Sequence, residues 1–143
     1  MDLDTQFRIA NLLALTGWVA LAAAPVARPQ LIGFARILGA ALALGYLTLI
    51  VASVSGGGGG LQGFEYTPAG IAKLFARPEA AFIGWVHYLA FDLWVGAWEA
   101  EDAGKRKLPH LLLLPCLFLT FMVGPVGLLC YLALRTAKGR RRA

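Results

Sequence analysis

The sequence predicts an all-α membrane protein: four transmembrane helices, with a short amphipathic interfacial helix between the second and the third. Hydrophobic residues make up 59% of the 143 residues, against about 45–50% in a typical soluble domain. They form four blocks, each near the roughly 20 residues that cross about 30 Å of hydrocarbon as a helix. A soluble four-helix core would need polar stripes that these blocks lack. We expect one transmembrane domain over residues 1–143, with spans at roughly 7–24, 31–54, 80–98 and 108–134 and a basic tail at 135–143.

The first two blocks are joined by the short link "VARPQ". A signal peptide also has an apolar core, but it prefers a positive lead, and "MDLDTQFR" carries two acids and one base. We therefore expect a retained helix. In the second block, Arg36 can reach the interface from about one turn inside. Ala35, Gly39 and Ala43 form a row of small residues that suits packing within the chain or in a homo-oligomer.

The link between the second and third blocks contains "SGGGGG", which we interpret as a flexible linker. A phosphate-binding loop would need a following Gly-Lys-Ser/Thr pattern, which this segment lacks. Thr67 and Pro68 then supply a helix N-cap and a first helical residue. Ile71, Leu74 and Phe75 fall on one face, so this segment is expected to lie at the membrane interface.

The fourth block contains Pro115 and the segment "GPVG" around Pro125. Proline inside a span removes a backbone donor and bends or breaks the helix. We favour a kink that shapes packing over a broken helix that exposes carbonyls to a ligand. Cys116 and Cys130 lie in this block, about 21 Å apart along one helix, and we expect them to be unpaired buried apolar residues.

The loop charges predict an orientation, because four spans put both termini on one side of the membrane. Eight basic residues share that side and five share the other: Arg8, Lys73, Arg77, Arg135, Lys138 and Arg140 to Arg142 against Arg28, Arg36 and Lys105 to Lys107. This bias favours cytoplasmic termini. The tail "RTAKGRRRA" is expected to bind anionic lipid of the bilayer rather than nucleic acid.

The third block carries His87 and Asp92 within an apolar run. A carboxylate there costs at least about 2.5–3.5 kcal/mol unless it is protonated or paired, so Asp92 should face the bundle interior. Five residues correspond to about 140° around a helix, so His87 and Asp92 cannot be neighbours. Trp85, Tyr88, Val95 and Glu99 share the face of Asp92, and Phe91, Trp94 and Trp98 share the face of His87.

Two interpretations of this pair stay open. In the structural one, Asp92 pairs with a tyrosine or Arg36, and His87 bonds a backbone carbonyl. In the functional one, both belong to a polar site in an aromatic-lined cavity. We predict no metal site. The sequence does not identify a cofactor. The candidate ligands His87, Asp92, Glu99, Asp102 and His110 follow no metal-binding spacing, and no nucleophile motif is visible.

The segments "HYLAFDLWVGAWEAEDA" and "PHLLLLPCLFLTFMVGPVGLLCYLALR" resemble the signature region of the abscisic-acid-deficient-four-like family of small integral membrane proteins, related to plant neoxanthin synthesis. The similarity covers about a third of the chain, residues 87–135, and is looser upstream. The positions that match the family pattern are His87, Phe91, Asp92, Gly96, Asp102, Pro109, His110, Pro115, Thr120, Gly124, Pro125 and Gly127.

The resemblance implies a role in forming neoxanthin from violaxanthin, an isomerisation that opens an epoxide to an allene. Such a step needs an acid and a base, which Asp92 with His87 or His110 could supply as catalytic residues. Phe91, Trp94 and Trp98 would bind the carotenoid substrate. The alternatives are a non-catalytic subunit that binds a carotenoid or a membrane protein partner, and a small ion-coupled transporter with Asp92 as its site. No plastid transit segment precedes the first block, so we expect a bacterial relative in the inner membrane.

Overall fold

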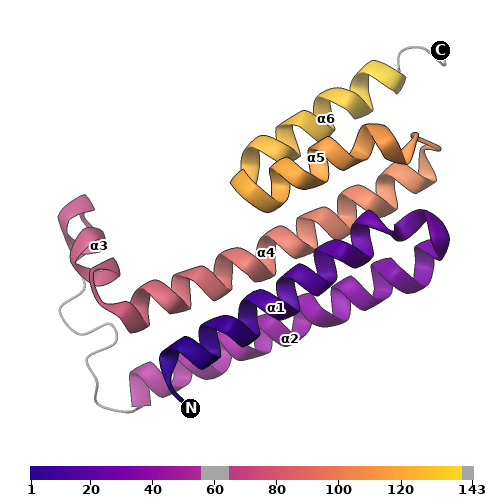
Figure 1. Ribbon diagram of the computed structural model, residues 1–143. Helices are drawn as coiled ribbons and strands as arrows, with labels where there is room; N and C mark the ends of the chain where they lie inside the picture. The colour runs from indigo at the N-terminus through magenta and orange to yellow at the C-terminus, as the bar shows by residue number, and fades with distance from the viewer. Residues whose placement is uncertain (56–64, 140–143) are drawn as a thin grey trace.

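The computed structural model describes residues 1–55 and 65–139, and these residues form helices and turns without a strand. Three long helices form the body of the molecule, and three shorter ones cover or follow it (Figure 1). They are α1 (Leu3–Ala22), α2 (Arg28–Ser55), α3 (Pro68–Phe75), α4 (Pro78–Lys105), α5 (His110–Val123) and α6 (Pro125–Gly139), with a 3-10 turn, η1 (Ala24–Val26), after α1. The all-α class is thus confirmed. The predicted glycine linker, from residue 56 on, and residues 140–143 of the basic tail lie outside the described residues.

Two helices, α2 and α4, are long and apolar enough to cross a membrane. Each has 28 residues, which is about 42 Å of helix at 1.5 Å per residue and exceeds a hydrocarbon core of about 30 Å. The outward side of α2 is apolar too, since Ile37, Leu44 and Val51 are all exposed. A helix with apolar side chains on its outward face as well as its packed face suits lipid rather than water.

Helix starts follow the local sequence signals. At α1, the Thr5 N–H donates to Asp2 Oδ1 at 2.7 Å, and this hydrogen bond lowers the pKa of the Asp2 carboxyl. At α3, Thr67 Oγ1 accepts from the Gly70 N–H at 3.0 Å, and Pro68 is the first helical residue. The predicted N-cap of the short helix is therefore confirmed.

The core lies where α1 packs across α4, and glycines allow the approach. A Cβ built on Gly17 of α1 would lie 2.7 Å from the Leu93 side chain. In return, a Cβ on Gly96 of α4 would lie 2.6 Å from the Trp18 ring. Without a side chain at these two positions, the helices can pack closely, which is how membrane helices commonly associate.

The fourth apolar block is a helical hairpin, which corrects the prediction of a single span. Gly124 adopts a φ of 43°, in the left-handed region, and ends α5, and Pro125 begins α6. The two helices lie side by side (Figure 1). With 14 and 15 residues, they are about 21 and 22 Å long, which is too short for either to cross about 30 Å of hydrocarbon.

The hairpin also corrects the expected separation of the two cysteines. Cys116 Sγ lies 3.3 Å from Cys130 Sγ, and both are free thiols. The earlier distance of about 21 Å assumed one continuous helix. Because the chain reverses at Gly124, residues at similar distances before and after the turn meet across the hairpin.

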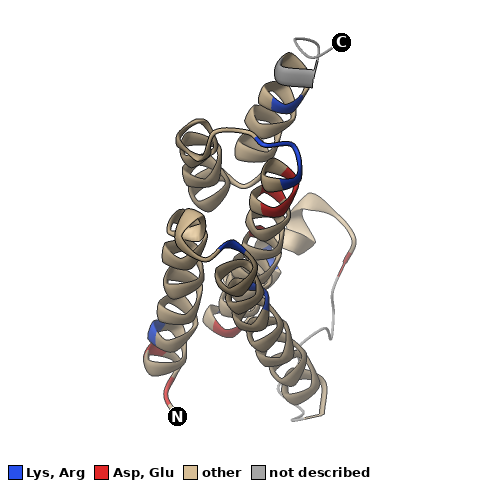
Figure 2. Ribbon diagram, turned by 90° about the vertical axis from the view of Figure 1, so that its right-hand side faces the viewer, with Lys and Arg blue, Asp and Glu red and all other residues tan. Residues whose placement is uncertain are grey.

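The first and last helices leave the bundle at opposite ends, unlike the expectation for four spans. α1 begins at one end, whereas α6 runs back beside α4 and finishes at the other (Figure 1). The additional chain reversal at Gly124 is the reason, because it returns the chain along the bundle once more and so moves the end of α6 away from the start of α1. Lys and Arg positions gather at the end where α4 leads into α5 and where α6 finishes (Figure 2). Lys105 ends α4, Arg106 and Lys107 follow it, the Arg28 side chain lies against Gly104, and Arg135 pairs with Asp102.

We expect Gly124→Ala to destabilise the protein. A left-handed conformation costs a residue with a side chain about 1–2 kcal/mol, and a Cβ there would lie 3.0 Å from Asp92 Oδ1. The measurement is thermal unfolding of the purified protein in detergent, followed by circular dichroism. Gly45→Ala is the matched control, because nothing lies within 4 Å of its added Cβ. An equal loss in both variants would contradict the role of Gly124 in the turn.

Candidate functional site

The turn between α5 and α6 lies over a polar face of α4. Asp92 and Glu99 are seven residues apart, two helical turns, so both carboxyl groups point from α4 toward the hairpin. Asp92 lies beside Gly124, and Glu99 bonds Thr120 of α5. A fully buried carboxyl group, Glu99, and a partly buried one, Asp92, thus line one side of a helix in an otherwise apolar bundle. This face is the strongest candidate site.

Asp92 has unused hydrogen-bonding capacity. Its Oδ2 is buried and accepts no hydrogen bond from any residue that the structure describes. The Tyr88 side chain, one turn earlier, lies beside the Asp92 carboxyl group and donates its hydroxyl to the Phe121 carbonyl oxygen at 3.1 Å. An Asp92–tyrosine contact was one of the structural alternatives. A buried polar atom without a partner is uncommon, so Asp92 Oδ2 stands out among the described side chains as one with unused hydrogen-bonding capacity.

Glu99 is the more deeply buried of the two acids, with an exposed fraction of 0%. The Thr120 hydroxyl lies 3.0 Å from Glu99 Oε1 and 3.2 Å from Oε2, and it donates to the carboxyl group. The third span expected at roughly 80–98 would place Glu99 at its boundary, which is wrong because α4 continues to Lys105. The seven-residue spacing from Asp92 was the signal that could have found it.

A second charged cluster joins the end of α4 to α6. Asp102 Oδ2 accepts from the Tyr131 hydroxyl at 2.5 Å and pairs with Arg106 Nε at 2.8 Å and Arg135 Nε at 3.3 Å. The Arg135 guanidinium lies over the Trp98 ring, 5.7 Å from its centroid. This network fixes α6 along α4, so we assign it a structural role.

Arg36 is also committed to the end of α4. It forms an ion pair with Glu101, which pairs with Lys105 as well. The structural alternative that joined Arg36 to Asp92 is therefore not what the structure shows.

The three predicted catalytic residues lie in three different places. Asp92 faces the hairpin, as predicted for the bundle interior. His87 is exposed on another side of α4, where its ring stacks on Phe91 at 4.6 Å and contacts Tyr46 at 5.3 Å. His110 begins α5, and its Nε2 lies 2.9 Å from the Ala22 carbonyl oxygen at the end of α1. The structure therefore brings neither histidine beside Asp92.

The three predicted aromatic residues lie together, as their spacing on α4 requires. Phe91, Trp94 and Trp98 line an apolar groove of about 460 Å³, which Val95 and two leucines of α6, Leu128 and Leu132, complete. Trp94 packs over Gly39 of α2, where a Cβ would lie 2.9 Å from the ring. Val95 is one turn from Asp92, and Leu128 is one turn from Gly124. One end of the groove therefore adjoins the polar face.

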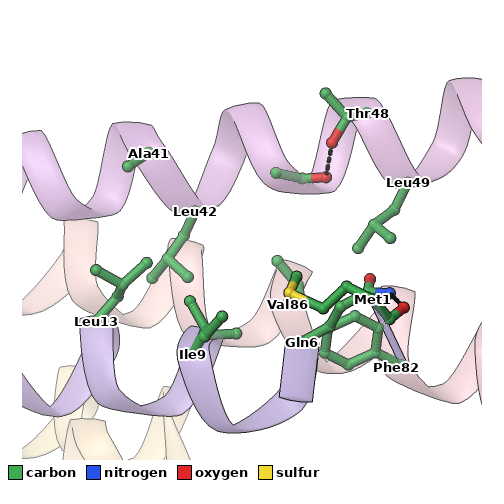
Figure 3. Close-up of a pocket in the computed structure, with 12 residues that line it drawn as sticks. Met1, Gln6, Ile9, Leu13, Ala41, Leu42, Thr48, Leu49, Phe82 and Val86 are labelled. Atoms are coloured by element: carbon green, nitrogen blue, oxygen red, sulfur yellow. Dashed lines mark hydrogen bonds between the residues drawn. The ribbon is translucent and has the colours of Figure 1, made fainter. Parts of the chain in front are cut away.

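A separate cavity of about 220 Å³ lies between the N-terminal part of α1, α2 and α4 (Figure 3). Its lining is apolar apart from Gln6 and Thr48. Both are bonded to backbone carbonyls nearby, Gln6 Nε2 to Met1 at 2.9 Å and Thr48 Oγ1 to Gly45 at 2.7 Å. No chemistry is suggested there. Within residues 1–55 and 65–139, no three His, Cys, Asp or Glu side chains group closely enough to hold a metal ion.

We expect Thr120→Val to lower the free energy of unfolding by about 1–3 kcal/mol, because it leaves the buried Glu99 carboxyl group without its hydroxyl donor. Thr120→Ser should retain most of the stability. The matched control is Thr16→Val, whose hydroxyl is exposed and bonds Leu12 of its own helix. Thermal unfolding in detergent measures all three, and a Thr120→Val protein as stable as the unmodified chain would contradict the pairing.

Comparison with known protein families matches residues 5–131, most of the chain, to the ABA DEFICIENT 4-like family. The match extends the resemblance of residues 87–135 to α1, α2 and α3. Neither the search of curated proteins nor that of solved structures finds a match to the chain. The two helices of membrane-spanning length agree with a membrane-associated family. The chain belongs to the ABA DEFICIENT 4-like family, which is associated with neoxanthin synthesis.

Proposed function

We propose that the protein isomerises an oxygenated carotenoid within the membrane, opening an epoxide to an allene, and that Asp92 moves the proton. The observation that carries the proposal is the buried, unpartnered Oδ2 of Asp92 one turn from an aromatic groove. Membership of a family associated with neoxanthin synthesis supplies the substrate class. The groove opens on the apolar outside of the bundle, from which a lipid-soluble substrate would enter.

The reaction needs one proton given and one taken. The carbon–oxygen bond of the epoxide breaks, and the oxygen keeps the electron pair and gains a proton to become a hydroxyl. The adjacent polyene carbon loses a proton, and the electrons of that bond form the second cumulated double bond. Atoms and electrons balance without an oxidant. One carboxyl group has two oxygens, so Asp92 could give a proton from one and take a proton at the other.

The positions of the side chains around Asp92 support a different set of partners for it in this proposed chemistry. His87 and His110 lie away from it, whereas the Tyr88 hydroxyl lies beside it. Tyr88 would therefore orient the carboxyl group. His110 is better explained as a contact that holds the end of α1 to the start of α5.

We expect Asp92→Asn to abolish conversion, with a loss of at least about 100-fold in product, the usual contribution of general acid–base catalysis. The chain and its variants would be expressed in a carotenoid-producing bacterium, and the extracted pigments compared by chromatography. Asp4→Asn makes the same change at an exposed position and should convert normally. An unchanged pigment profile with the unmodified protein present in the membrane would instead favour a non-catalytic carotenoid- or partner-binding subunit.

The hairpin also suggests a revised membrane arrangement. α1, α2 and α4 would cross the bilayer, and α5 and α6 would enter from one side and return. Asp92 lies near the middle of α4, so the hairpin turn and Asp92 would meet near the bilayer midplane. Placing the tips of broken helices at this depth is a known way to build a site in a membrane.

In this arrangement the basic residues predict the opposite location for the N-terminus. Six described basic residues lie toward the end where α4 leads into α5, as their positions in the chain and their contacts with the end of α4 show: Arg28, Arg36, Lys105, Arg106, Lys107 and Arg135. The described part of the chain has three toward the other end: Arg8, Lys73 and Arg77. Since cytoplasmic segments carry the excess of Lys and Arg, the C-terminus would be cytoplasmic and the N-terminus external.

Reporter fusions in a bacterial host would test this orientation. A green fluorescent protein fused after residue 143 should fluoresce, because this reporter folds in the cytoplasm, and the same reporter fused before residue 1 should not. Alkaline phosphatase, which is active only outside the cytoplasm, should give the reverse result. Fluorescence from both fusions would restore the expectation of two cytoplasmic termini and contradict the hairpin arrangement.

A further inference from the structure

A cavity of about 370 Å³ lies between α2, α3 and α4, separate from the polar face. Its walls are mainly apolar, with Tyr46 and Ile50 from α2 and Leu74 and Phe75 from α3. A few polar side chains join them: Ser53, Arg77, Glu79 and His87. An apolar enclosure with a small number of polar groups is the usual composition of a site for a small organic ligand.

The short helix α3 covers this cavity because glycine lets it approach α4. A Cβ built on Gly84 would lie 2.5 Å from the Phe75 ring, so the ring rests against the backbone of α4 at this point. Thr67 caps the start of α3, and only two residues separate its end from α4. The cover is therefore held to α4 by the Phe75 contact and by this short link.

His87 connects this cavity to the aromatic groove. It lines the cavity, and its ring stacks on Phe91, which lines the groove together with Trp94 and Trp98. Within the described part of the chain, His87 makes ring contacts and no hydrogen bond. Its two ring nitrogens thus remain available to a ligand that passes this point.

The cavity and the groove together form a track along one side of α4. From Glu79 at the cavity to Trp98 at the groove, the helix rises about 28 Å. The track has polar groups at the cavity end, aromatic side chains along its length, and Asp92 one turn from the groove. It fits a straight, rigid polyene with an oxygenated ring at each end, which is about as long.

We propose that the cavity between α2, α3 and α4 binds the distal, unreacted end ring of the carotenoid, while the reacting ring lies in the groove beside Asp92. The inference rests on the proposed function. The polyene runs past Phe91 and His87, and the lining residues Ser53 and Glu79 offer hydrogen bonds to oxygens of the distal ring. The cavity would thus select substrates that have a complete second ring.

The test is binding of two pigments to the purified protein in lipid nanodiscs, followed by the induced circular dichroism of the polyene. One pigment is a full-length xanthophyll with a hydroxylated epoxide ring at each end, and the other is a shortened polyene that keeps one such ring. Ala80→Phe fills the cavity, because Ala80 is part of its lining. Ala43→Phe is the matched control, at an exposed position of α2.

Ala80→Phe should weaken binding of the full-length pigment at least tenfold and leave the shortened pigment unaffected, and Ala43→Phe should change neither. Equal effects of Ala80→Phe on both pigments, or no effect on either, would overturn the inference. Asp92→Asn should bind both pigments as the unmodified chain does. If the unmodified protein binds neither pigment, the proposed function fails together with the inference, whereas binding that is insensitive to Ala80→Phe removes the inference alone.

Discussion

The missing N–H of Pro125 is the constraint on which the rest of the structure depends. In a continuous helix the Phe121 carbonyl would accept from the residue four positions on, which is Pro125 and has no donor. An unsatisfied backbone group costs several kcal/mol in lipid. The Tyr88 hydroxyl supplies the missing donor, and Gly124 takes the left-handed conformation that reverses the chain. The hairpin and its contacts with α4 follow from this substitution of a side-chain donor for a backbone donor.

The parts of the fold that depend on local sequence could be predicted. Apolar blocks of sufficient length place α2 and α4, and Thr67 with Pro68 starts α3. The reversal at Gly124 could not be predicted, because a kinked helix and a hairpin share the same glycine and proline. Tertiary contacts distinguish the two: the hydrogen bond from Tyr88 to the Phe121 carbonyl oxygen, and the packing of Gly127 against Thr120 across the hairpin. The orientation predicted from loop charges depends on the number of crossings, so the hairpin changes the assumption on which that prediction was based.

The candidate site, like the fold, could be predicted from the sequence only in part. Helical periodicity correctly separates the face of Asp92 from the face of Phe91, Trp94 and Trp98, because angles around a helix are fixed by spacing. Periodicity says nothing about depth, so Glu99 was taken for a boundary residue although it is fully buried. It also says nothing about residues on other helices, so His110 could not be located at the end of α1.

The two faces of α4 meet where α6 packs against it. The proposed substrate would reach the aromatic face from lipid, whereas Asp92 lies on the other face, so under the proposal the reacting ring would pass between α4 and α6. Val95 and Leu128 form the wall at that point. The position of α6 is fixed two turns further on, by the bonds of Tyr131 and Arg135 to Asp102. The charged cluster at the end of α4 therefore helps to hold α6, and with it Leu128, in place beside Val95.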